Sequence, residues 1–471
     1  MPRLSRHPRT GVNRARDMLP AMRILMTCAL DVWALAEGGG APTLARTLRA
    51  YGEAGHTVDL VLPDIGANHF YRGRTQLDEL PEQRPAIPGV AYHAFHMPSV
   101  RDVIERLPLA GDSGGRLPGP VAAVDQKLRF ALAFPWLAAR VAERLLRTQP
   151  PYDVLYGYEV HGVLVARLLR RRGWRLPLVA RFQGTVMHPA LRDRLLYARR
   201  YEEALALKAP AELYIMTDDG TRGAEVLARL NPRSAGHVRF WRNGLELDRL
   251  RPASAEERAA ARAALGVPGD AFVLLTASRL ATWKRVDRAV RAMARVRAWL
   301  PQGLLLVVGD GEERARLEAL ARELGVEAKV RFCGAVPQRE VARYMHAADV
   351  FLAVADLSNV GNPLLEAMAC GMCVVAVDAG DTRELVRDGV TGRLVDSENR
   401  SGVAKPLEER LADLVVALGN DPGQRARLAE GAATYAREHF WTWDERMAAE
   451  LREVEALVSR RADTATPARP G

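Results

Sequence analysis

Residues 359–371 read NVGNPLLEAMACG, a tight loop that opens into a helix. Pro363 suits the first helical turn, where its missing N–H costs no hydrogen bond. The N–H groups of Leu364 and Leu365 are then expected to be free and to lie at the positive end of the helix dipole, which attracts phosphate. Glu366 follows within reach of hydroxyl groups beside that phosphate. A phosphate next to a diol is typical of a nucleotide sugar, so this stretch predicts a site for one.

The sequence on both sides of this stretch alternates short apolar strands with helical segments. In the first half we predict strands at 23–27, 57–62, 153–157, 178–182, 213–216 and 238–240, with a glycine loop at 37–40 and helices at 42–54, 121–147 and 162–172. In the second half we predict strands at 272–276, 304–308, 330–332, 350–352 and 374–377. One predicted helix begins near 285, and another follows the glycines at 309–311 and ends near 324. Such alternation favours parallel sheets covered by helices on both faces. The predicted fold class is therefore α/β, with two Rossmann-like doubly wound domains facing across a cleft.

Domain boundaries follow from these elements and from composition. We predict a basic flexible arm over 1–21, domains over 22–243 and 244–430, C-terminal helices over 431–460 and a disordered tail over 461–471. The helical pattern of the last segment, from about 424 to 458, is interrupted near 440–443.

The composition excludes several classes of protein. The chain has 471 residues, 48% of them hydrophobic, so it can bury a sizeable core. Its net charge is +10, but the basic arm lacks interleaved aromatic residues, and no nucleic-acid partner is expected. The pair Cys370 and Cys373 has metal-ligand spacing, yet no second pair completes a zinc site, and buried, inert thiols are expected. With no signal peptide and no long apolar run, a cytoplasmic location is expected, with a peripheral membrane contact left open.

Several segments, taken in order, resemble retaining glycosyltransferases of the GT-B fold, the glycosyl-transferase group one or family four. Gly38-Gly39-Gly40 resembles the first glycine loop of that family, and Asn243-Gly244 with Arg251-Pro252 resembles its interdomain linker. Residues 278–284, SRLATWK, resemble its arginine–lysine phosphate segment, and 308–311 and 330–334 resemble later strand ends. The resemblance covers roughly 22–457. It implies that 22–243 is the acceptor domain, that 244–430 is the nucleotide-sugar domain and that the helices over 431–460 pack back toward the N-terminal domain.

The resemblance implies a transferase that moves a sugar from a nucleotide-sugar donor, expected to be a UDP-sugar, to a hydroxyl acceptor with retention of configuration and without a metal ion. Arg279 and Lys284 are the expected catalytic cations, because fixed positive charge stabilises a departing diphosphate. The expected donor-binding residues are Gly39, Gly40, Gln183, Ser358, Asn359, Gly361, Asn362, Leu364, Leu365 and Glu366. His161 is a candidate on the acceptor side. No cofactor is expected, and the acceptor is left open among lipid-linked glycans, polysaccharides and small metabolites.

Two positions depart from the family pattern. Ser358 stands where the family commonly has a glutamate, eight positions before Glu366, and Gln183 stands where it usually has a histidine. Glutamine cannot titrate, so a proton-transfer role at that position is excluded. These departures leave two alternatives open: a nucleotide-sugar epimerase of the same fold, and a non-catalytic relative that binds nucleotide sugars.

Overall fold

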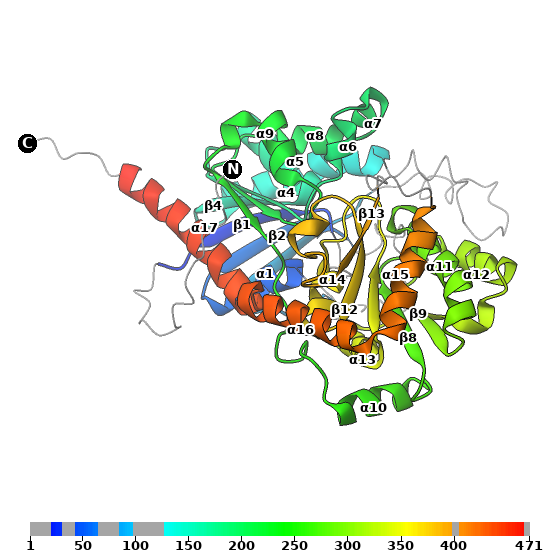
Figure 1. Ribbon diagram of the computed structural model, residues 1–471. Coiled ribbons are helices and arrows are strands. Elements are labelled where there is room, and N and C mark those ends of the chain that lie inside the picture. Colours follow the sequence, from blue (N-terminus) through cyan, green and yellow to red (C-terminus); the bar gives the residue numbers. More distant parts are fainter. Residues whose placement is uncertain (1–19, 31–42, 65–83, 98–126, 398–404, 466–471) are drawn as a thin grey trace, which may run out of the picture.

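The computed structural model describes residues 20–30, 43–64, 84–97, 127–397 and 405–465, and only the backbone over 462–465. The expected basic arm, apart from its last two residues, and the glycine loop at 37–40 lie outside these ranges. The described residues form two parallel sheets of seven and six strands, each covered by helices (Figure 1). The predicted α/β class with two Rossmann-like domains is confirmed.

The first sheet has the strand order β3-β2-β1-β4-β5-β6-β7, and all of its pairings are parallel. Its strands are β1 Arg23–Cys28, β2 Thr57–Pro63, β3 Val90–Phe95, β4 Val154–Tyr158, β5 Leu178–Phe182, β6 Leu213–Thr217 and β7 Val238–Trp241. The central strands are continuous apolar runs because helices bury both of their faces. The order reverses between β1 and β4.

Helices form a layer on each face of this sheet. They are α1 Thr43–Glu53, the π-helical turn η3 Arg129–Ala133, α4 Phe134–Thr148, α5 Glu159–Arg171, α6 Met187–Ala190, α7 Arg194–Arg199, α8 Tyr201–Leu207 and α9 Gly223–Leu230. One core holds side chains of α1 together with the C-terminal helix α17, Trp443–Ala465. The opposite core holds side chains of α4 and α5. The part of the predicted 121–147 helix before 127 lies outside the described residues.

Helix α5 approaches β1 at Gly162. A Cβ atom at this position would lie 2.1 Å from the backbone oxygen of Thr27, and the Thr27 hydroxyl donates a hydrogen bond to the Gly162 carbonyl at 2.8 Å. We therefore predict that Gly162→Ala lowers the free energy of unfolding by about 1–3 kcal/mol, even after the better helix propensity of alanine offsets part of the clash. Gly269→Ala is the matched control, because no atom lies within 4 Å of its added Cβ. Urea unfolding that shows equal stability for both variants would contradict this prediction.

The second sheet has the order β10-β9-β8-β11-β12-β13, again with parallel pairings. Its strands are β8 Phe272–Ala277, β9 Gly303–Val308, β10 Val330–Gly334, β11 Val350–Ala353, β12 Cys373–Asp378 and β13 Arg393–Asp396. Its helices are α10 Ala255–Ala264, α11 Val286–Trp299, α12 Arg314–Glu323, α13 Gln338–Ala347, α14 Asn362–Ala369, α15 Leu407–Asn420 and α16 Pro422–His439. The order reverses between β8 and β11.

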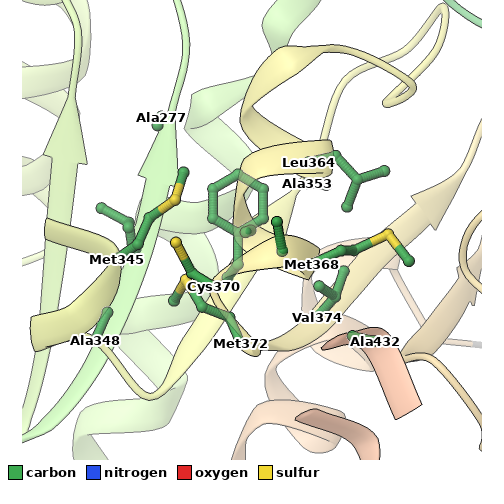
Figure 2. Packing of buried hydrophobic residues seen from close by; sticks show 14 of the residues in the cluster. Ala277, Met345, Ala348, Ala353, Leu364, Met368, Cys370, Met372, Val374 and Ala432 are labelled. Carbon is green, nitrogen blue, oxygen red and sulfur yellow. The ribbon is translucent and has the colours of Figure 1, made fainter. Parts of the chain in front are cut away.

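Helix α14, which carries the opening stretch, is held by the core of the second domain. Figure 2 shows Leu364, Met368 and Cys370 among packed side chains, with Met345 and Ala348 on one side and Ala432 of α16 on another. Burial raises the pKa of Cys370 and of Cys373 to about 12, so both thiols stay protonated at neutral pH, as expected of inert cysteines. This packing on several sides fixes the position of the N-terminus of α14.

The C-terminal helices divide differently from the prediction. Residues 431–439, predicted to pack toward the N-terminal domain, belong to α16, whose Ala432, Tyr435 and Ala436 lie in the core of the second domain. The apolar side chains of α16 pack against α14, so α16 remains on the second domain up to the break before α17. Only α17 returns to the first domain. It includes residues 461–465 of the expected tail, and residues 466–471 lie outside the described ranges.

Candidate functional site

The N-terminus of α14 lies at the carboxyl ends of β8 and β11, where the strand order of the second sheet reverses. The helix begins at Asn362, one residue earlier than the sequence predicts, with Gly361 as its N-cap and Pro363 in its first turn. The N–H groups of Leu364 and Leu365 are therefore not free: both hydrogen-bond to the Gly361 carbonyl, at 3.0 and 3.2 Å. This earlier start makes the Gly361 carbonyl the first acceptor inside the helix. An anion here would be attracted by the helix dipole rather than by these two amides.

A small pocket of about 40 Å³ opens beside this helix end. Ser278 and Lys284 line it from the segment after β8, and Gly361, Pro363 and Leu364 line it from the start of α14. Open α/β sheets bind ligands outside the carboxyl ends of their strands at the point where strand order reverses. The pocket occupies that point in the second sheet.

Two cationic side chains lie together at the pocket. Lys284 lines it, with its Nζ atom 4.1 Å from the ring centroid of Trp283, and Arg279 is exposed next to it. Burial and the charge of Arg279 lower the pKa of Lys284 to about 8, while the carboxylate of Asp219 in the first domain acts in the opposite direction. Lys284 thus lines the pocket beside α14, and the charges of Arg279 and of Asp219 from the other domain both act on it.

Glu366 lies in the second turn of α14 and is almost fully buried. It accepts a hydrogen bond from the side-chain amide of Gln338, at the start of α13. Burial raises the pKa of Glu366 to about 7, the Gln338 hydrogen bond lowers it, and the charge of Glu246 raises it. A carboxylate held this way keeps hydrogen-bonding capacity for a ligand hydroxyl group.

Comparison with known proteins identifies the family of this chain. Residues 257–433 match the model of the family described as glycosyl transferases group 1. The D-inositol 3-phosphate glycosyltransferase of Kribbella flavida is 30% identical over 394 residues, which are 81% of this chain and 84% of that protein. This chain belongs to the group 1 glycosyltransferases.

Solved structures show the same fold. Sucrose-phosphate synthase of Thermosynechococcus elongatus is 22% identical, with a TM-score of 0.66, and the match covers 94% of this chain and all of that one. Anabaena HepE in complex with UDP and glucose is 21% identical, with a TM-score of 0.62, and the match covers 92% of this chain and 99% of that one. At these identities the comparison establishes the GT-B fold of this group 1 glycosyltransferase.

Three of the predicted donor-binding side chains are engaged within the protein. The Ser358 hydroxyl donates to the carbonyl of Asp219 at 2.7 Å and accepts from the Val360 N–H at 3.0 Å, which ties the two domains together. Asn359 accepts from the N–H of Ala355 and donates to the carbonyl of Val377. Asn362 accepts from the side chain of Asn243 in the linker. The structure thus places these residues in the framework of the site.

The remaining predicted residues lie in or near the first domain. Gln183 donates through its side-chain amide to the Tyr158 hydroxyl at 2.8 Å. His161 pairs with Glu202 at 3.0 Å and packs against the rings of Phe130 and Phe134, so its imidazole belongs to the contact among α4, α5 and α8. Gly39 and Gly40 lie outside the described residues.

Two carboxyl groups of the group 1 glycosyltransferase were not assigned to the site from its sequence. Asp219 lies two residues after β6, and the sequence analysis gave it no role at the site. Glu159 follows β4, and the sequence gives it no recognised pattern. Both lie within two residues of the end of an apolar strand, a position that marks the functional edge of a parallel sheet and could have drawn attention to them. Within the described ranges, no cluster of three or more His, Cys, Asp or Glu residues could hold a metal ion.

The same ranges contain no helix that is both long enough and apolar enough to span a bilayer.

Proposed function

We propose that this group 1 glycosyltransferase transfers a sugar from a nucleotide-sugar donor, with UDP as the nucleotide, to a hydroxyl acceptor, with retention of configuration and without a metal ion or cofactor. The observation that carries the proposal is the position of Lys284 beside the N-terminus of α14, at the point where the second sheet reverses, with the charge of Arg279 acting on it. Solved neighbours of the same fold support the choice of donor, since HepE is bound to UDP and glucose in one structure and to UDP-glucose in another.

The cations provide the chemistry that a metal ion would otherwise supply. Cleavage of the sugar–phosphate bond leaves a nucleoside diphosphate with additional negative charge. Arg279 can contact two phosphate oxygens with its planar guanidinium, while Lys284 supplies a point charge. Because Lys284 is partly desolvated, its charge acts through a low dielectric, and its contribution to transition-state stabilisation exceeds that of a surface lysine.

The test is nucleotide release. The protein is incubated with UDP-glucose, UDP-N-acetylglucosamine, GDP-mannose and ADP-glucose, each with and without a pool of hydroxyl acceptors. Sugar transfer to an acceptor with the anomeric configuration of the donor supports the proposal, and transfer should persist in EDTA. An altered nucleotide sugar formed without any acceptor would instead indicate an epimerase, and calorimetric binding without turnover would indicate a non-catalytic relative.

Glu366 provides a second test of the nucleotide site. If its carboxylate accepts hydrogen bonds from the ribose hydroxyl groups, Glu366→Ala should weaken UDP binding by about 1.5–3 kcal/mol, or roughly 10- to 100-fold in Kd. The ionised form is the acceptor, and its pKa is about 7, so UDP affinity of the wild-type protein should fall as pH drops below 7. Isothermal titration calorimetry measures both effects.

The ligand itself supplies the control for this prediction. 2′-Deoxy-UDP, which lacks the ribose 2′-hydroxyl group, should bind the wild-type protein more weakly than UDP. Glu366→Ala should reduce this difference in affinity between the two nucleotides. A variant that distinguishes the two nucleotides as well as the wild-type protein would show that Glu366 does not bind ribose.

A further inference from the structure

Large apolar side chains gather on one surface of the first domain. Of the eight large hydrophobic residues that are exposed within the described ranges, six lie on η3, α4, α7 and α8 or directly beside them. Their exposed fractions run from 40% to 63%. Such a grouping of exposed apolar side chains typically marks an interaction site. We call it the apolar patch; its members are Leu128, Leu132, Trp136, Leu195, Tyr201 and Leu205.

Half of the apolar patch is a stripe along η3 and α4. Leu128, Leu132 and Trp136 recur at every fourth position, which places them on one side of this helical segment. Phe134 and Ala138, on the other side, lie in the core between α4 and the first sheet. The stripe therefore faces solvent because the sheet already occupies the opposite face of the helix.

Lys127 joins this stripe to α7 and α8. Its ammonium group donates a hydrogen bond to the carbonyl of Arg199, the last residue of α7, at 2.8 Å. Its Nζ atom also lies 5.4 Å from the ring centroid of Tyr201, the first residue of α8. Figure 1 shows α7 at the outer edge of the molecule, beside α8. The stripe and the residues of these two helices thus belong to one surface.

The border of the apolar patch is basic. The stripe continues at the same spacing with the exposed Arg140 and Arg144, and the guanidinium carbon of Arg140 lies 4.8 Å from the ring centroid of Trp136. Over 191–210 only one exposed charged residue is an acid, Asp193, and its carboxylate caps the N-terminus of α7. The exposed cations over the same range are Arg192, Arg194, Arg199, Arg200 and Lys208.

An anionic bilayer matches both features of this surface. Leucine and tryptophan side chains enter the boundary between lipid head groups and acyl chains, and surrounding arginines attract lipid phosphates. A second copy of this chain fits less well, because a two-fold contact would place each basic border against the same border of its partner. A nucleic acid would engage the cations but not the exposed leucines.

We propose that the apolar patch docks this protein on an anionic phospholipid bilayer, with Leu132 and Trp136 inserted among the head groups and the basic border bound to lipid phosphates. The sequence left a peripheral membrane contact open, and the geometry assigns it to η3, α4, α7 and α8 of the first domain. Lipid binding is measured without a donor, so its outcome is independent of the function proposed above.

The test is co-sedimentation of the full chain with vesicles. The wild-type protein should bind vesicles of equal parts phosphatidylglycerol and phosphatidylcholine at least about 10-fold more tightly than vesicles of phosphatidylcholine alone, and added salt should weaken this binding. The double variant Leu132→Ser with Trp136→Ser should bind the anionic vesicles about 10- to 100-fold more weakly. The matched control is Trp299→Ser on α11, where an equally exposed tryptophan lies outside the apolar patch, and its Kd should change by less than about twofold.

A conservative variant tests insertion itself. Trp136→Phe keeps an aromatic ring, so it should bind the anionic vesicles within about threefold of the wild-type protein. Lipids with brominated acyl chains quench tryptophan fluorescence on contact. The bound wild-type protein should therefore be quenched, and Trp136→Phe should lose most of this quenching while it stays bound.

Three results would overturn the proposal. The first is a wild-type protein that does not bind anionic vesicles. The second is a double variant that binds them as tightly as the wild-type protein, or a Trp136→Phe variant that is quenched as strongly. The third is a dimer that light scattering detects without lipid and that the double variant lacks, because the apolar patch would then hold a second copy of the chain. The substituted positions are exposed, so the thermal unfolding midpoint should be the same for all variants.

Discussion

Replacement of Lys284 by methionine is expected to lower kcat/KM for nucleotide release by roughly 10²- to 10³-fold. The Lys284 ammonium is partly buried at the pocket beside α14, where it faces the charge that develops on the departing diphosphate. Methionine keeps the length and apolar stem of the side chain but removes the charge. The loss should appear in kcat as well as in KM, because the diphosphate is more negative in the transition state than in the bound donor.

The pH dependence of the wild-type protein provides a second measurement. Burial and Arg279 lower the pKa of Lys284 to about 8, so the ammonium is present below that pH and is lost as pH rises through it. Nucleotide release measured at low donor concentration should therefore decline above about pH 8, and Lys284→Met should not show this decline. The control is Lys405→Met, since Lys405 is exposed and pairs with Asp413 far from the pocket lining. Equal rates for Lys284→Met and Lys405→Met would remove the main support for the proposed function.

Replacement of Glu450 by glutamine is expected to lower the free energy of unfolding by about 3–5 kcal/mol. Glu450 lies on α17 and is fully buried in the first domain, with two buried arginines around it. It accepts the Tyr156 hydroxyl hydrogen bond at 2.5 Å and pairs with Arg446 at 3.0 Å and Arg181 at 3.7 Å. Loss of its charge leaves two buried guanidinium groups without a counter-charge, which the low dielectric of the core makes costly.

The same helix carries a matched control. Glu453, three residues further along, also pairs with an arginine of the first domain, Arg239, at 2.8 Å. That pair is partly exposed to solvent, so Glu453→Gln should cost no more than about 1 kcal/mol. Urea unfolding compares the two variants directly. A similar loss in both would mean that burial does not set the strength of these pairs.

Much of the architecture could be predicted from local pattern. The apolar runs at 272–276 and 304–308 correspond to β8 and β9, because strands buried on both faces must be apolar throughout. The break near 440–443 separates α16 from α17. Strands β3 and β13 and helices α10 and α15 were not predicted. Both strands lie at sheet edges, where their formation depends on pairing with β2 and β12 rather than on burial of both faces.

The amino-acid sequence by itself determined which residues form the strand ends and which carry the charges, because strand formation, helix caps and charge are local properties. Local pattern predicted the helix that carries Glu366, whereas the expectation that Arg279 and Lys284 act beside it came from the resemblance of residues 278–284 to the phosphate segment of the family. The tertiary structure alone decided which charges meet: it brought Asp219 to Lys284, engaged Ser358 in a contact between domains and placed Glu159 at the reversal of the first sheet. These are relations between residues far apart in the chain, and they depend on the order of strands and on burial, which local patterns do not encode.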